Sequence, residues 1–149
     1  MIGYITLGTN DLQRAGKFYD KLLAEIGAER AMTDERMLGW SNGEGPMFSV
    51  ITPFDELNAT MGNGTMIALD LKTGDAVERF YQKAISLGAT DEGEPHDRGS
   101  SMGFYGGYFR DLDGNNSSRD SATSWRSTTA DFIFALAMTA LNSSSGTIK

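Results

Sequence analysis

The first half of the chain changes its hydrophobic period several times. Apolar and polar side chains alternate over residues 2–7, which predicts a first β-strand. Over residues 11–26 the apolar positions recur every three or four residues, which predicts an amphipathic helix that Gly27 ends. Short strands are then predicted at Met37–Ser41 and Met47–Ile51, with a turn rich in Gly, Asn and Pro between them.

The same order begins again in the second half. A strand is predicted at residues 65–71 and a helix at residues 75–87, which Gly88 ends. The pair Phe18-Tyr19 returns 62 positions later as Phe80-Tyr81, at the same depth in the second helix. A period of this length, with matching strand, helix and glycine, indicates duplication of one β-α-β-meander module.

Residues 106–115 predict a strand that runs into a tight turn. Tyr108, Phe109 and Arg110 suit an extended segment, and Asp113-Gly114-Asn115 supplies residues that tolerate a positive φ angle. A returning strand should follow, but residues 116–121 are polar and do not alternate. The second module therefore lacks its usual last strand at the expected place.

Beyond this turn the chain is rich in Ser and Thr and holds one apolar run, residues 132–141. Asp131 as a cap and the alanines of the run favour a helix. Apolar residues at every second position, from Phe132 to Met138, favour a replacement strand. Both structures stay open, with the helix slightly favoured. In either case we expect an uncovered sheet edge to pair with another chain.

Composition narrows the range of functions. The chain has 149 residues, 40% of them hydrophobic, which is enough for one domain or two fused modules. A net charge of -7 disfavours nucleic acid and anionic membranes as partners. The absence of cysteine excludes disulfides, thiolate metal sites and a cysteine nucleophile. No signal peptide or membrane-length apolar run is present in the sequence, so we expect a cytoplasmic protein.

These features together resemble one family. The residues that carry the resemblance are the first strand with its Ile5-Thr6-Leu7-Gly8, the Phe18-Tyr19 helix, the repeat and the Tyr108–Asn115 motif. They resemble the vicinal oxygen chelate superfamily, also called the glyoxalase, bleomycin resistance and extradiol dioxygenase superfamily, over residues 1–115. The chain carries Leu112 where the family motif commonly has proline.

The resemblance implies an α+β fold. Two tandem βαβββ modules would form a cupped, partly open barrel-like sheet, commonly within a homodimer. Residues 1–57 would form the first module and residues 58–115 the second, incomplete one. Residues 116–149 would be an atypical tail attached to one structural domain.

Enzymes of this family bind a divalent metal through His, Glu or Gln side chains on the first and last strand of each module. The resemblance puts Tyr4 at the first of these positions and Met66 at its counterpart in the second module. The strand Met47–Ile51 has no such side chain, and the fourth ligand would lie in the missing strand. Since these residues suit such a metal poorly, we expect no cofactor, with a divalent metal as the alternative.

Eight residues are candidates for lining a ligand cavity. The strand residues would offer aromatic and sulfur surface, and two loop residues would offer a proton carrier and an anion clamp. The candidates are Tyr4, Trp40, Phe48, Met66, His96, Arg98, Tyr105 and Tyr108. The alternative is that the strand residues fill the sheet interior, which is favoured for Phe48 and Met66, and that His96 is only solvated.

The expected function is metal-free binding of a small aromatic or cationic molecule, with no catalytic residue assigned. One alternative is a metal-dependent lyase or dioxygenase of the same superfamily with an atypical site. The other is an inactive relic or an interaction module.

Overall fold

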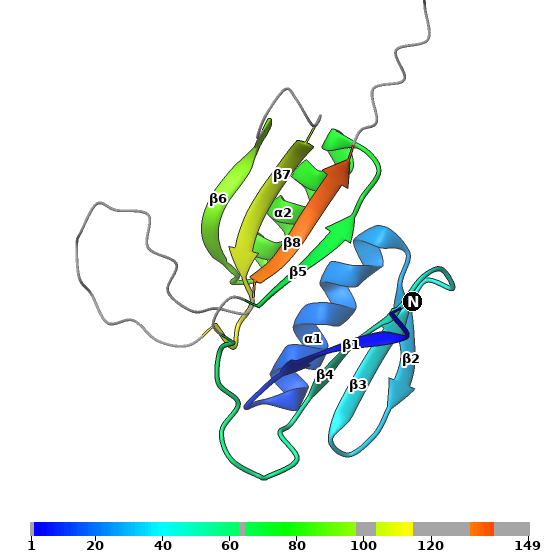
Figure 1. Ribbon diagram of the computed structural model, residues 1–149, viewed down its shortest axis with the longest axis vertical. Coiled ribbons are helices and arrows are strands. Elements are labelled where there is room, and N and C mark those ends of the chain that lie inside the picture. The colour runs from blue at the N-terminus through cyan, green and yellow to red at the C-terminus, as the bar shows by residue number, and fades with distance from the viewer. Residues whose placement is uncertain (1, 63–64, 98–103, 115–131, 139–149) are drawn as a thin grey trace, which may run out of the picture.

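The computed structural model describes residues 2–62, 65–97, 104–114 and 132–138 (Figure 1). The first module consists of β1 (Tyr4–Gly8), α1 (Leu12–Leu23), the 3-10 turn η1 (Ala24–Ile26), β2 (Glu29–Thr33), β3 (Met37–Ser41) and β4 (Met47–Ile51). The second module consists of β5 (Met66–Asp70), α2 (Gly74–Ser86), β6 (Thr90–Asp97), β7 (Phe104–Arg110) and β8 (Phe132–Met138).

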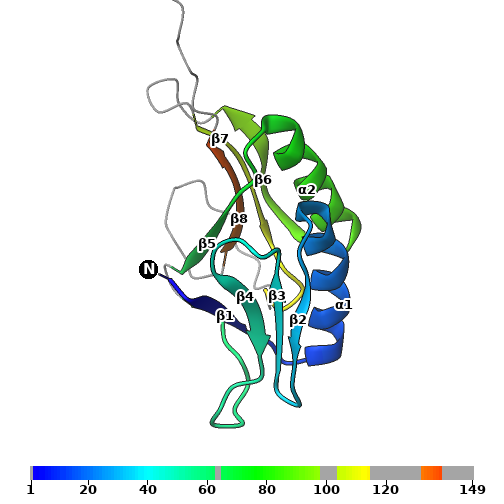
Figure 2. The ribbon, with the colours of Figure 1, turned by 90° about the vertical axis from the view of Figure 1, so that its right-hand side faces the viewer.

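The two modules have the same strand topology. The first sheet has the order β1-β4-β3-β2 and the second the order β5-β8-β7-β6. In each sheet the first and last strands of the module run parallel, and the other pairs are antiparallel. Both helices lie on the same side of the sheets (Figure 2). The predicted α+β fold with two tandem βαβββ modules is confirmed.

Both predicted helices form, and local chemistry explains where they begin. The Asp11 carboxylate accepts a hydrogen bond from the Arg14 amide (2.9 Å), and the Thr73 hydroxyl accepts one from the Ala76 amide (3.2 Å). At the other end of α1 and η1, Gly27 has a φ angle of 71°, which favours glycine. The apolar stripes of both helices are buried against the sheets.

The buried side chains of the two modules form one hydrophobic core. In the first module the Tyr19 ring packs against Trp40 and Phe48, with centroid distances of 5.6 and 4.8 Å. In the second, Phe80 packs against Phe109 at 6.2 Å. Helices α1 and α2 also contact one another, so the modules share an interior rather than only a connector.

The last strand of the second sheet comes from the apolar run in the tail. No strand follows the turn directly in the described residues, and β8 takes its place between β5 and β7. Ala135 pairs with Leu69 on one side and with Gly107 on the other. The slightly favoured helix is therefore wrong, and the replacement strand is the structure that forms. An extended segment can satisfy the open edges of both neighbours, whereas a helix cannot.

Two further strands, β2 and β6, lie where the sequence predicted none. Both are edge strands, and every residue of β2 is exposed. A bulge interrupts the pairing of β2 with β3, and two irregularities interrupt that of β6 with β7. Because neither segment buries one face, neither has the alternating pattern that would predict a strand. Neither of the described helices has the length and apolar character needed to cross a membrane.

Candidate functional site

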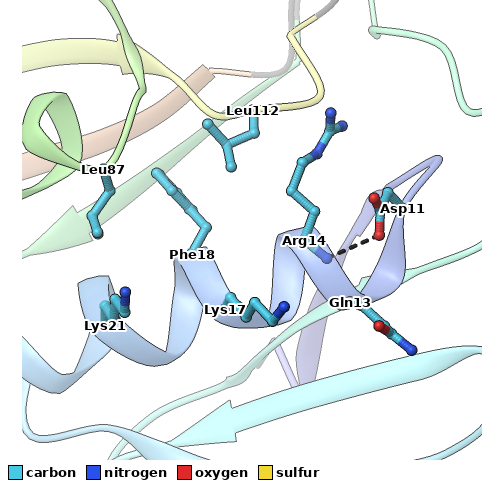
Figure 3. Close-up of a pocket in the computed structure, with 8 residues that line it drawn as sticks. All are labelled: Asp11, Gln13, Arg14, Lys17, Phe18, Lys21, Leu87 and Leu112. Atoms are coloured by element: carbon cyan, nitrogen blue, oxygen red, sulfur yellow. Dashed lines mark hydrogen bonds between the residues drawn. The ribbon is translucent and has the colours of Figure 1, made fainter.

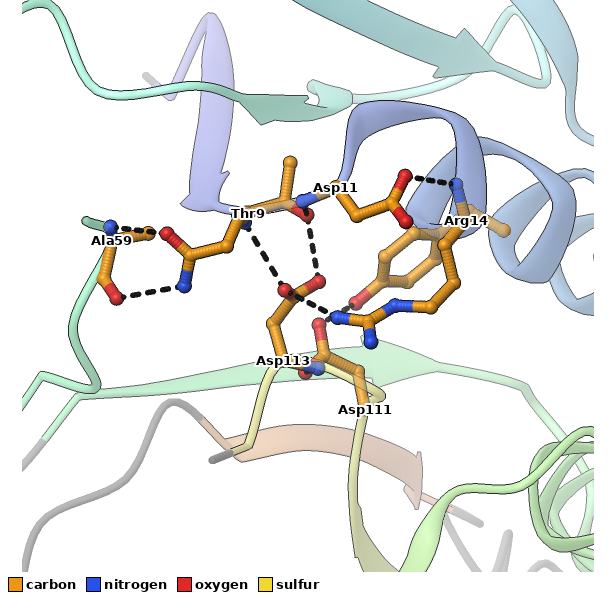
Figure 4. A network of polar contacts seen from close by, with 8 residues as sticks. Thr9, Asp11, Arg14, Ala59, Asp111 and Asp113 are labelled. Atoms are coloured by element: carbon orange, nitrogen blue, oxygen red, sulfur yellow. Dashed lines mark hydrogen bonds and ion pairs between the residues drawn. The ribbon is translucent and has the colours of Figure 1, made fainter. Parts of the chain in front are cut away.

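The turn after β7 is built into the junction between the modules (Figure 4). The Asp113 carboxylate accepts hydrogen bonds from the Thr9 hydroxyl (2.7 Å), the Asn10 amide (3.1 Å) and the Arg14 guanidinium (2.9 Å). Only 6% of the Asp113 side chain is exposed. A carboxylate this buried needs such partners, because burying an unpaired charge would lower the stability of the fold.

Asp111 makes the second contact of this turn across the junction. Its carboxylate accepts a hydrogen bond from the Tyr19 hydroxyl (2.7 Å) and one from the Asp113 amide (3.0 Å). The two aspartates therefore join the end of β7 to the beginning and middle of α1. The residues that marked the family in the sequence serve here to hold the two modules together.

A cavity of about 680 Å³ lies between the modules. Its walls come from the end of α1 with η1, the turn between β3 and β4, and β5 with the segment that leads into α2. Trp40 and Phe48 lie at its base, where they are 1% and 5% exposed, and the Arg30 guanidinium lies over the Trp40 ring at 5.5 Å. The aliphatic side chains of Ile5, Leu69 and Leu71 complete the apolar part of the lining.

The charged residues that line this cavity are mostly acidic. Glu25, Glu44 and Asp70 contribute carboxylates, and Lys72 contributes the one ammonium group among its lining residues. The hydrogen bond from Lys72 holds the pKa of Asp70 below its usual value. Glu25 pairs with Lys83 (3.3 Å), which is not part of the lining. The lining is therefore apolar and aromatic inside, with an excess of negative charge.

The candidate residues of the sequence lie on two sides of the sheets. Trp40, Phe48 and Tyr105 face the helices, and the hydroxyl of Tyr105 bonds to Glu78 on α2. Tyr4 and Met66 alternate with the helix-facing residues of β1 and β5, so they face the other side, where they are 63% and 54% exposed. Half-buried Tyr108 precedes buried Phe109 and also faces away from the helices.

His96, one of the two predicted loop residues, does not line the cavity. His96 is exposed on edge strand β6, where its Nδ1 donates a hydrogen bond to the main-chain oxygen of Glu94 (2.8 Å). Arg98 lies outside the described residues. Of the eight candidates, the structure brings Trp40 and Phe48 together in the cavity between the modules.

The strands at the family's metal-ligand positions carry other side chains. Tyr4 lies on β1 and Met66 on β5, and β4 contains Met, Phe, Ser, Val and Ile. The position of the fourth strand belongs to β8, whose sequence is Phe-Ile-Phe-Ala-Leu-Ala-Met. A divalent ion of this family prefers imidazole and carboxylate ligands, and none of these strand residues supplies one there. These residues do not fit such a metal.

The acidic part of the cavity was not predicted from the sequence. Glu25 lies at the end of a helix, Glu44 in a turn and Asp70 at the end of a strand, so no spacing links them. The turn that carries Glu44 was recognisable from its glycines and proline, but its position beside β5 was not. Only the packing of one module on the other brings the three carboxylates to one cavity.

Comparison with known proteins agrees with this architecture. The model of the Glyoxalase/Bleomycin resistance protein/Dioxygenase superfamily matches residues 1–117. A solved glyoxalase/bleomycin resistance protein from Albidiferax ferrireducens T118 is 26% identical, with a TM-score of 0.75, and the alignment covers 92% of this chain and 98% of that one. The sequence matches no curated protein.

Two more distant structures share the fold. A glyoxalase/bleomycin resistance protein/dioxygenase family enzyme from Burkholderia phytofirmans PsJN is 15% identical, with a TM-score of 0.65 and coverage of 91% of this chain and 97% of that one. The fosfomycin resistance protein FosX from Mesorhizobium loti is 14% identical, with a TM-score of 0.62 and coverage of 94% and 93%. With its family model matched over most of its length, the chain belongs to the glyoxalase/bleomycin resistance protein/dioxygenase superfamily.

Proposed function

We propose that this protein binds a small aromatic cation, without a metal, in the cavity between its modules. The observation that carries the proposal is the combination of an apolar lining with three carboxylates and one ammonium group around the same cavity. The apolar lining favours an aromatic body, and the carboxylates favour a positive group over a negative one. A volume of about 680 Å³ is within the usual range of small-molecule sites.

Two further observations support binding rather than metal chemistry. The side chains at the family's ligand positions, among them Tyr4 and Met66, are poor ligands for its divalent ions. The net charge of -7 favours the approach of a cation at long range. Relatives that are named for bleomycin resistance make a basic drug a reasonable choice of ligand.

Calorimetric titration tests this function directly. We expect 4-phenylbutylamine and tryptamine to bind, and the dissociation constant of each to be the same with and without a chelator. Glu44→Gln should weaken binding of the amine by about threefold to tenfold, because it removes one carboxylate from the lining. Glu35→Gln, an exposed carboxylate outside the lining, is the matched control and should bind like the wild type.

Two results would contradict the proposal. One is the absence of heat of binding with either cation. The other is binding that appears only after metal is added and is abolished by the chelator. The second result would favour the alternative of a metal-dependent lyase or dioxygenase, and metal analysis of the purified protein would then identify the ion.

We also propose that the protein forms a homodimer. β1 pairs with β4 alone and β5 with β8 alone among the described strands, so each presents one open edge. Open strand edges pair readily with another chain. Sedimentation equilibrium should give twice the 16.2 kDa of the chain, and a monomer at all concentrations would contradict this.

A further inference from the structure

A second hollow lies on the outer surface where α1 meets the second module (Figure 3). It has a volume of about 300 Å³ and is lined by one face of α1, by the end of α2 and by the turn after β7. It is separate from the cavity between the modules, because the two share no lining residue. We call it the α1 groove.

The charge of the α1 groove is opposite to that of the whole chain. Arg14, Lys17 and Lys21 line it together with one carboxylate, that of Asp11, although the chain carries a net charge of -7. The Arg14 guanidinium is already paired with Asp113 (2.9 Å). Lys17 and Lys21 are exposed, and within the described part of the chain neither forms an ion pair. Two ammonium groups one helical turn apart are therefore available to one anion.

The floor of the α1 groove is apolar. Phe18 is 3% exposed, and Figure 3 shows its ring pointing from α1 into the space between Leu87 and Leu112. Leu112 also packs closely on Gly88, since its Cδ2 lies 3.3 Å from where a Cβ on that residue would stand. Leu112 occupies the motif position at which proline is common in the resembled family, so this wall of the groove comes from a departure from the motif.

We propose that the α1 groove binds a small amphipathic anion, such as an aryl or alkyl carboxylate. Its carboxylate would lie between Lys17 and Lys21, where two cations reduce the cost of holding the charge. Its apolar body would lie on Phe18, Leu87 and Leu112. The proposal is independent of the cation site, because it concerns another surface and the opposite charge.

Three ligands with the same apolar body test the proposal. They are 4-phenylbutyrate, 4-phenylbutan-1-ol and 4-phenylbutylamine, which carry a negative, a neutral and a positive head. In NMR titrations of the intact protein we expect the carboxylate to shift amide signals of residues 11–18 and 111–113, none of which lines the cavity between the modules. We expect the alcohol to bind at least tenfold more weakly, because it lacks the charge. The amine should leave these signals unmoved.

Variants then assign the groups that bind. The double variant Lys17→Gln with Lys21→Gln should weaken the binding of 4-phenylbutyrate by about tenfold. Leu112→Ala should weaken this binding by about threefold. Arg79→Gln, which removes an exposed cation that lines neither the α1 groove nor the cavity between the modules, is the matched control and should leave the affinity unchanged. Both lysine variants change exposed side chains, so a thermal melt like that of the wild type is expected.

Equal binding of the carboxylate and the alcohol would overturn the proposal. So would a double lysine variant that binds as tightly as the wild type, or shifts confined to residues outside the α1 groove. Failure of the amine to bind anywhere would contradict the cation site instead and leave this groove unaffected. The two proposals are therefore separable in one set of titrations.

Discussion

Asp113 accepts several of the hydrogen bonds that join the two modules. It accepts three hydrogen bonds from residues of the first module and is nearly buried, although it belongs to a turn at the surface end of β7. Asp111, two positions earlier, holds the hydroxyl of Tyr19. In the sequence these aspartates were recognised only as part of a turn and a family motif, since their partners lie about a hundred positions away.

Asp113→Asn tests this assignment. The amide keeps the shape but loses the charge and one acceptor atom, so we expect the free energy of unfolding to fall by roughly 1–3 kcal/mol. Urea titration followed by circular dichroism measures the change. Asp55→Asn is the control, because this exposed carboxylate accepts one amide hydrogen bond within its own loop and should cost less than about 0.5 kcal/mol. A loss for Asp113→Asn no larger than that of the control would contradict the role of Asp113.

Tyr81 gives the fold a dependence on alkaline pH. Burial raises the pKa of Tyr81 to about 12, and its hydrogen bond to Asp91 adds to the effect. The folded protein holds the neutral phenol more firmly than the unfolded chain, whose tyrosine has a pKa of 10.0. This stabilisation is complete below pH 10 and is lost as the pH rises through about 12.

Thermal melts between pH 8 and pH 12 would measure this dependence. Tyr81→Phe should lose less stability than the wild type between pH 10 and pH 12, because it has no phenol to ionise. Tyr4→Phe, at an exposed position, should follow the wild type. Identical pH profiles for the wild type and Tyr81→Phe would show that this phenol does not control the transition.

At the scale of elements, β8 is the strand that completes the second sheet. It is central, with β5 on one side and β7 on the other, and it occupies the place that β4 has in the first sheet. Its seven residues are apolar throughout, in keeping with a strand inside a sheet. Residues 111–131 lie between it and β7 in the sequence, so the closing strand is reached by an unusually long connection.

Hydrogen exchange of the full chain tests this strand. Amides of residues 133–137 should be protected to a degree similar to those of β4, since both strands pair on two sides. Amides of β2, an edge strand, should exchange faster and serve as the internal comparison. Exchange of residues 133–137 at the rate of an unfolded chain would show that β8 is not part of the sheet in solution.

At the scale of the whole molecule, the two modules share one hydrophobic core. Their buried side chains belong to one cluster, their helices touch, and the turn after β7 bonds to the beginning of α1. A shared core is expected to unfold in one cooperative step, even though each module repeats the same topology. The two ligand sites proposed above both lie where the modules meet.

Phe80→Ala tests this cooperativity. Phe80 is buried in the second module, so the variant should lower the free energy of unfolding by about 3–5 kcal/mol. With Trp125 replaced by Phe, the fluorescence of Trp40 reports on the first module alone. In urea titrations, the midpoint of unfolding measured by this fluorescence should fall together with the midpoint measured by circular dichroism. Phe54→Ala, where the ring is 88% exposed, is the control. A Trp40 transition that does not move would mean that the modules unfold separately.

The sequence by itself determined the elements whose signals are local. The apolar stripes of α1 and α2, the glycines that end these helices, and the strands β3 and β4 follow from neighbouring residues, and all were predicted. The first strand, the Phe18-Tyr19 helix, the repeat and the Tyr108–Asn115 motif together carried the resemblance that predicted the fold class and the family. Among the residues that line the cavity between the modules, Trp40 and Phe48 were candidates from the sequence.

Only the tertiary structure decided the rest. β2 and β6 are strands because β3 and β7 offer them an edge, and β8 is a strand because two open edges lie beside it. The acidic lining of one cavity and the basic lining of the α1 groove combine residues from separate elements. Hydrophobic period and turn chemistry act over a few residues, whereas strand pairing and the charge of a cavity depend on which distant segments meet.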